Sequence, residues 1–263
     1  MKEFRFSEAE VKAKKVLDQC GLIDPVDVPI NRIILGRKAF YEEIPLEGKE
    51  GEIISVDGRS IITVNSNIQY EPKKRFVAAH ELGHHEMHRD LKSMFSDTEE
   101  DLMNWYQSGP QEMQANEFAA EFLMPSEVFY KFCEKRKFEP KVIHELADRF
   151  NVSKTAAILR FVKRGNHPVF IMFCKDNKMK WWKKSDDFFP YCELFTRDQP
   201  PPTGSVAYEI FSSGKVYTGD EASQQIWKSD WFKMKEDEKE TIFFEYCLYA
   251  PSYNYTISVI WEK

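Results

Sequence analysis

The sequence lacks the features of an exported or membrane-spanning chain. No stretch approaches the roughly 20 consecutive apolar residues that a membrane helix needs, and the first ten residues contain no apolar signal core. The five cysteines are odd in number and widely spaced, without a C-x-x-C pair, so neither a disulfide framework nor a cysteine zinc site is indicated. Free thiols suit a reducing compartment. We therefore expect a soluble, cytoplasmic protein that does not associate with membranes.

The sequence also lacks an excess of positive charge and any internal repetition. The 263 residues carry 37 Lys and Arg against 43 Asp and Glu, with a pI near 5.7, which argues against general nucleic-acid binding. The sequence contains no internal repeat and no long low-complexity segment. Its length can bury a full core and suits one large or two small domains. No pattern predicts an oligomeric state.

Histidine is rare but concentrated in one place. Four of the six histidines fall within the nine positions from His80 to His88, where His80, Glu81 and His84 form the motif H-E-x-x-H. On an α-helix, residues four apart lie about 40° apart in projection and about 6 Å apart along the axis, so both imidazoles can converge on one ion. Neutral imidazole is a usual zinc ligand. Glu81 would lie beside the ion and reach a bound water, as in zinc peptidases.

This motif would arise by chance about 0.014 times in a chain of this composition, so a third ligand must support it. A catalytic zinc takes three protein ligands and keeps one open position. Three acids compete in the helical run before Pro125: Glu112, Glu117 and Glu121. Glu112 lies at the edge of the Ala/Phe packing face and is favoured, whereas the other two are expected to be solvated. Asn116 would hold one histidine ring and set its tautomer.

Helices are predicted before the histidine motif, across it and after it. A capping box begins a helix over 7–20, and a shorter helix is expected after Pro29. The helix of the motif is expected over 72–89, where Gly83 would allow another backbone to approach closely. The acidic segment 95–110 indicates a short helix within a loop.

A β-hairpin is predicted ahead of that helix. The runs 51–56 and 59–65 flank Asp57 and Gly58, and an Asp-Gly pair between β-rich runs is a strong hairpin signal. In zinc peptidases a sheet edge beside the cleft often holds the substrate as an added strand, and 61–65 is the candidate. An ordinary structural strand fits at least as well, because edge strands are usually covered or blunted.

The two motifs together resemble the ImmA/IrrE family of metallo-endopeptidases, over about residues 7–165. The matching residues are Arg75-Phe76-x-x-Ala79-His80-Glu81-Leu82-Gly83-His84 with His88, and Glu112-x-x-Ala115-Asn116-x-Phe118-Ala119-Ala120-Glu121-x-Leu123-Met124-Pro125. The resemblance implies His80, His84 and Glu112 as zinc ligands and Glu81 as the catalytic residue. It also implies a helix-turn-helix repressor as substrate, because characterised relatives cleave such repressors and thereby release mobile-element or stress-response genes.

The mechanism expected from these residues needs one further group. Glu81 would take a proton from the zinc-activated water and pass it to the leaving amine. A donor should also stabilise the oxyanion, and Tyr106, His85 and His144 are candidates among which the sequence does not choose. His88 lies on the ligand side, one turn further on. It would serve the cleft or simply occupy the helix C-terminus, where protonated histidine is favourable; the second role is favoured.

Residues 142–165 have the pattern of a helix, a turn and a second helix, which resembles a DNA-binding helix-turn-helix. Between positions 141 and 164, six basic residues face two acidic ones, a net charge of +4. The presumed recognition helix, 153–163, consists mostly of Ala, Ile, Leu, Phe and Val, and a fold by itself does not establish function. We therefore favour core packing over DNA contact and expect no DNA binding.

The pattern changes at His167. The runs 168–174 and 179–182 indicate another hairpin, and 241–248 and 255–261 are further strand candidates. Five of the six tryptophans lie in this half, where burial is the default for large aromatic side chains. A ligand sensor, a surface for docking a repressor, or a scaffold would each fit.

These patterns predict an α+β protein of two domains. Residues 1–165 would form a helical zinc-peptidase domain with a small antiparallel sheet and the helix-turn-helix-like segment 140–165, and residues 166–263 a β-rich α+β domain. The predicted function is that of a zinc-dependent endopeptidase that cleaves a protein substrate, in mobile-element or stress-response control. The alternatives are a DNA-binding regulator with structural zinc and a catalytically silent interaction protein. A regulator would tolerate Glu81→Gln, whereas a peptidase would lose turnover.

Overall fold

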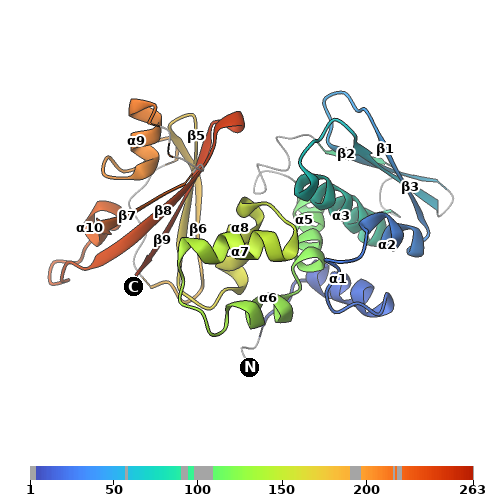
Figure 1. The fold of residues 1–263 in the computed structure, drawn as a ribbon, viewed down its shortest axis with the longest axis horizontal. Coiled ribbons are helices and arrows are strands. Elements are labelled where there is room, and N and C mark those ends of the chain that lie inside the picture. Colours follow the sequence, from blue (N-terminus) through green and yellow to red (C-terminus); the bar gives the residue numbers. More distant parts are fainter. Residues whose placement is uncertain are drawn as a thin grey trace. The chain divides into compact units, whose positions relative to one another are not determined.

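The chain forms two compact units. The computed structural model describes residues 4–56, 59–89, 94–97, 109–189, 197–215, 217 and 221–262. One unit comprises Met1–Phe132 with Glu145–Ala156, and the other comprises Cys133–His144 with Ala157–Lys263 (Figure 1). The division between the units therefore falls inside two helices, α7 (Pro140–Phe150) and α8 (Lys154–Arg164). The predicted domain boundary at 165/166 lies just after the second of these helices. No helix among the described residues is long and apolar enough to cross a membrane.

The first unit contains a four-stranded mixed sheet with the strand order β1-β3-β2-β4. Its strands are β1 (Ala39–Ile44), β2 (Gly51–Val56), β3 (Arg59–Asn65) and β4 (Met94–Asp97). The predicted hairpin is confirmed with its bounds, and β2 pairs with β3 in an antiparallel register that joins Ile53 to Ile62. The turn residues Asp57 and Gly58 lie outside the described residues.

Strand β3 is central, so the interpretation of 61–65 as a free edge for substrate is wrong. Strand β1 pairs with it in parallel, with Phe40 opposite Ile61, and this pair also makes the sheet mixed rather than antiparallel. The sequence of β1 gives little warning, because only its first residue is buried and no apolar alternation marks it. The predicted helix over 95–110 is wrong at its start, since Met94–Asp97 pairs with β2 as a strand.

Helices pack against this sheet and against one another (Figure 1). They are α1 (Glu8–Gln19), α2 (Ile30–Gly36), α3 (Glu71–Met87), α5 (Pro110–Leu123) and α6 (Ser126–Cys133). The capping box of α1 is confirmed, with both of its hydrogen bonds present. Gly83 permits the expected close approach, because a Cβ there would lie 3.2 Å from the Ala115 Cα of α5. The histidine helix and the second motif helix are therefore in direct backbone contact.

The predicted helical pair over 142–165 is present as α7 (Pro140–Phe150) and α8 (Lys154–Arg164). Asn151 has a positive φ of 49° and turns the chain between them. Helix α8 buries Ile158 and Phe161 and also two of the basic residues, Arg160 and Arg164. Because these two cations are buried, fewer are available for phosphate contacts than the sequence suggests, which favours the packing interpretation.

The second unit is built on a five-stranded antiparallel sheet with the order β6-β5-β9-β8-β7. Its elements are β5 (Phe170–Lys175), β6 (Lys178–Lys184), α9 (Val206–Ser213), β7 (Glu221–Trp227), α10 (Lys228–Trp231), β8 (Ile242–Ala250), a 3₁₀ turn (Pro251–Tyr253) and β9 (Tyr255–Glu262). The four predicted strands are confirmed. Asp176 and Asn177 both have positive φ, as a tight hairpin turn requires. Trp231 and Phe232 are buried in the aromatic core beside this sheet.

Candidate metal centre

Helix α3 presents two imidazoles on one face. His80 and His84 are fully buried, and their Nε2 atoms lie 3.0 Å apart. Four residues correspond to a little more than one helical turn, so the backbone alone brings these rings together. The local expectation from the motif therefore holds in three dimensions.

Helix α5 brings a carboxylate to the same point. Glu112 Oε2 lies 3.1 Å from the Nε2 atom of His80 and 3.1 Å from that of His84. The three residues form the one group of possible metal ligands of their kind among the described residues. The Glu112 side chain is 23% exposed, so the group is reached from solvent on the carboxylate side. Of the three competing acids, the structure places Glu112 with the histidines.

The spacing of the three donor atoms suits a small tetrahedral ion. Ligands about 2.0–2.1 Å from a zinc ion in tetrahedral directions lie about 3.3–3.4 Å from one another. The sides of the triangle measure 3.0, 3.1 and 3.1 Å, so each ligand needs to move by only a few tenths of an ångström. Two nitrogen donors and one oxygen donor are also the chemistry that zinc prefers.

Asn116 sets the tautomer of the first histidine. Its Oδ1 atom lies 2.9 Å from His80 Nδ1, and both side chains are buried. Because an amide oxygen only accepts, His80 Nδ1 carries the hydrogen and Nε2 keeps its lone pair for an ion. The structure therefore brings Asn116 to the position expected from the sequence.

A second set of hydrogen bonds, which the sequence did not predict, sets the tautomer of His84. Gln114 Oε1 lies 3.0 Å from His88 Nε2, and His88 Nδ1 lies 2.9 Å from His84 Nδ1. With the amide oriented in this way, His88 Nε2 donates, a neutral His88 accepts at Nδ1, and His84 donates from its own Nδ1. Burial lowers the pKa of His88 and favours this neutral form.

His88 is thus the C-cap residue of α3, as expected, and it is also hydrogen-bonded to a candidate ligand. Its lowered pKa weakens the expected interaction of a protonated histidine with the helix terminus. No sequence signal identified Gln114, because its partner lies on another helix.

Glu81 is fully buried beside the two histidines, and its carboxylate packs against strand β2. A Cβ at Gly51, the first residue of that strand, would lie 2.7 Å from Glu81 Oε1 and 2.5 Å from Val77 Cγ1. Only glycine therefore fits beneath this carboxylate without displacing it. Sequence reasoning assigned Gly51 to the hairpin and missed this contact.

The structure describes two of the three oxyanion donors that the sequence suggested. His85 is engaged elsewhere, with Nδ1 2.8 Å from Ser60 Oγ and Nε2 3.0 Å from the Arg37 carbonyl, so it has no N–H left for a substrate. His144 belongs to the second unit, where its Nε2 lies 3.2 Å from the Tyr246 hydroxyl. Tyr106 lies outside the described residues.

The expectation that Glu121 is solvated is wrong. Its side chain is fully buried and accepts hydrogen bonds from the Ser126 backbone N–H, at 3.0 Å, and from the Ser126 hydroxyl, at 2.6 Å. The carboxylate thus joins the end of α5 to the first turn of α6, where an acceptor satisfies a helix N–H that has no intrahelical partner. Glu117, the other rejected acid, is partly buried.

Buried charges fix the position of α3. Arg75 donates to the carbonyls of Phe150, at 3.0 Å, and Pro25, at 2.9 Å, and burial lowers the pKa of its guanidinium. Near the other end, Glu86 accepts from Arg37 Nε at 2.6 Å. Two anchors of this kind hold the helix that carries three of the candidate site residues.

Residues 35–162 match the family model Peptidase_M78, described as the IrrE N-terminal-like domain. Residues 35–162 belong to the ImmA/IrrE family. The matched range contains α3 and α5, so it includes every residue of the donor triangle and Glu81. The ImmA/IrrE assignment places this region among peptidases.

Other comparisons address the fold beyond this IrrE-like domain. The chain is similar to a transcriptional regulator of Mycobacterium tuberculosis, with a TM-score of 0.64 and 14% identity, over 98% of this chain and 77% of that one. At this identity the likeness shows a shared fold, which extends through the second unit. No curated protein matches the chain.

Proposed function

We propose that this ImmA/IrrE-family chain is a zinc-dependent endopeptidase. The observation that carries the proposal is the triangle of His80 Nε2, His84 Nε2 and Glu112 Oε2, beside the buried carboxylate of Glu81. Two neutral imidazoles and one carboxylate are a known ligand set for catalytic zinc. When bound, zinc would polarise the scissile carbonyl and lower the pKa of water toward about 7.

Each protein group then has a defined task. Glu81 removes a proton from the attacking water and delivers it to the leaving amine, so that a C–O bond forms and the peptide C–N bond breaks. Asn116 and His88 hold the two imidazoles in the tautomer that directs Nε2 toward Glu112. Gly51 leaves room for the Glu81 carboxylate beside this group.

The substrate that we propose is a protein, namely a helix-turn-helix repressor in mobile-element or stress-response control, which the chain would meet in the cytoplasm. Membership of the ImmA/IrrE family supports a peptidase that acts on repressors. The similar M. tuberculosis protein is described as a transcriptional regulator, which is compatible with a role in gene control. The burial of Arg160 and Arg164 makes direct DNA binding through α8 the weaker candidate.

The purified wild-type chain and three variants test the metal assignment and the catalytic assignment separately. The wild type is expected to bind about one equivalent of zinc, and Glu112→Gln to bind it much more weakly. Glu117→Gln is the matched control, because it changes an acid of the same helix outside the triangle. Glu81→Gln should bind zinc normally and cleave no protein. Equal zinc affinity in Glu112→Gln and Glu117→Gln would contradict the ligand assignment.

A further inference from the structure

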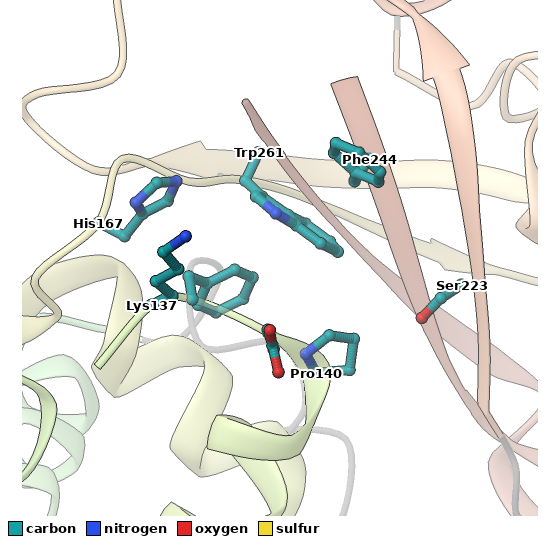
Figure 2. A pocket seen from close by; sticks show the side chains of 8 residues that line it. Lys137, Pro140, His167, Ser223, Phe244 and Trp261 are labelled. Atoms are coloured by element: carbon teal, nitrogen blue, oxygen red, sulfur yellow. The ribbon is translucent and has the colours of Figure 1, made fainter. Parts of the chain in front are cut away.

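The second unit contains a cavity of about 470 Å³. This volume lies within the range of about 300–1,000 Å³ that is usual for small-molecule sites. Its lining comes from the segment that leads into α7, from His167, which follows the end of α8 by three residues, and from strands β7, β8 and β9 (Figure 2). The lining residues are Lys137, Phe138, Glu139, Pro140, His167, Ser223, Phe244 and Trp261. None of these residues belongs to the metal centre.

Flat aromatic rings form much of the wall. The Trp261 and Phe244 rings stack, with centroids 5.6 Å apart and an interplanar angle of 25°. Phe138 meets Trp261 edge-on, with centroids 4.9 Å apart and an angle of 75°. A planar aromatic ligand fits such a wall best, because it can lie flat on one ring and meet another with its edge.

Hydrogen bonds hold the pocket wall in place without a ligand. Asn166 donates to the carbonyls of Cys133, at 2.6 Å, and Arg136, at 2.9 Å, and so fixes the segment before α7. His167 donates from Nε2 to the Glu262 carbonyl at 2.8 Å and stacks on Phe138 with an angle of 9°. A wall that is already ordered loses little conformational entropy when a ligand binds.

The charges at the pocket favour an anionic group. Lys137 is exposed and makes no ion pair with any residue that the structure describes. Glu139 is the residue before α7, where its carbonyl accepts from the Val142 N–H at 2.8 Å. The positive end of the helix dipole therefore offsets the Glu139 carboxylate, while Lys137 has no such counterpart. Figure 2 shows Lys137 near His167 at one end of the pocket and Ser223 toward the other.

We propose that this pocket binds a planar aromatic acid, with its ring packed against the wall formed by the Trp261, Phe244 and Phe138 side chains and its carboxylate at Lys137. The Glu139 carboxylate can accept a hydrogen bond from a ring N–H of such a ligand. The site would be a small-molecule site in a unit that carries none of the peptidase residues. This proposal does not depend on the proposed peptidase activity.

Binding of indole-3-acetate to the full chain, followed by saturation-transfer NMR and calorimetry, tests the proposal. Indole lacks the carboxylate and tryptamine replaces it with an amine, so the three probes differ in charge on one ring system. Indole-3-acetate is expected to bind most tightly, about fivefold better than indole, which is the gain from one partly exposed ion pair. Lys137→Met should remove that advantage, whereas Lys135→Met, an exposed lysine outside the pocket, should preserve it.

Ser223→Phe supplies an independent test, because it places a bulky ring in the cavity from an exposed strand position. This variant should lose binding of indole-3-acetate and of indole alike while it keeps the circular dichroism spectrum of the parent. The absence of saturable binding at millimolar probe would overturn the proposal. Tighter binding of tryptamine, or binding that persists unchanged in Lys137→Met, would overturn the assignment of an acid. The Glu81→Gln chain should bind the probes like the wild type, whatever its peptidase activity.

Discussion

Substitution of Gly51 by alanine should separate catalysis from metal binding. The added Cβ would lie 2.7 Å from Glu81 Oε1 and 2.5 Å from Val77 Cγ1. Because carbon atoms in contact prefer about 3.5–4.0 Å, the valine methyl must yield by about 1 Å and the carboxylate by several tenths of an ångström. Misplacement by about 1 Å can cost about 100-fold in rate. We therefore expect kcat to fall about 10- to 100-fold in Gly51→Ala.

Zinc affinity should stay unchanged in this variant, since the three nearest contacts of the new Cβ involve only Val77 and Glu81. Overpacking costs about 1–3 kcal/mol, and the replacement of a strand glycine returns about 0.5–1 kcal/mol, so the net loss of stability should not exceed about 2.5 kcal/mol. Adding Val77→Ala to Gly51→Ala should recover stability but not turnover.

Gly36→Ala is the matched control for that experiment, because no heavy atom lies within 4 Å of the Cβ that it adds. The assay is the cleavage rate of a repressor substrate, with bound zinc measured in the same preparations. If Gly51→Ala folded, bound zinc and cleaved at the rate of Gly36→Ala, the assigned position of Glu81 as proton carrier would be refuted.

Three further predictions follow from single contacts. Gln114→Leu should weaken zinc binding about 10- to 100-fold in a chelator competition, as is typical when a partner of a ligating histidine is lost, whereas Gln111→Leu on the same helix should not. Glu121→Ala leaves two donors without their buried acceptor and should lower the free energy of unfolding in urea by about 1–3 kcal/mol; a loss under about 0.3 kcal/mol would refute its structural role. Burial raises the pKa of Glu245 above its ordinary 4.5, so the Glu245 carboxyl group stays protonated to higher pH in the folded chain than in the unfolded chain. The contribution of Glu245 to the stability of the fold therefore falls as the pH rises above the unfolded-state pKa. The stability of Glu245→Gln relative to wild type should therefore increase as the pH rises above the ordinary pKa of 4.5, and a constant difference in urea midpoints would contradict the shift.

The sequence predicted best what depends on neighbours along the chain. The pairing of His80 with His84, the capping box of α1 and the hairpin of β2 and β3 each follow from residues a few positions apart, where helix and strand geometry determine which side chains meet. Even Gly83 was informative, because a helix position without a side chain is itself a sign of close packing.

What the sequence could not predict depends on contacts between distant segments. Strand β1 is mostly exposed and pairs in parallel with β3, so its sequence shows no alternation of apolar and polar residues that would predict a strand. Because β1 was not predicted, the position of β3 inside the sheet was not predicted either. The spacing of Glu121 from Glu117 predicted that both side chains face solvent. Glu121 instead accepts a hydrogen bond from Ser126, which follows the proline that ends the helix. The contact of Gly51 with Glu81 likewise appears only when β2 is packed on α3.

The central claim is that Glu81 makes this chain a peptidase, and newly formed protein N-termini test it most directly. The measurement compares host cells that express the wild type with cells that express Glu81→Gln at the same level, with and without DNA damage and other stresses. The account predicts one or a few cuts, in a helix-turn-helix repressor, that occur only with the wild type. Identical N-terminal profiles under all conditions, with both proteins folded and loaded with zinc, would contradict it and would favour a regulator or a silent interaction protein.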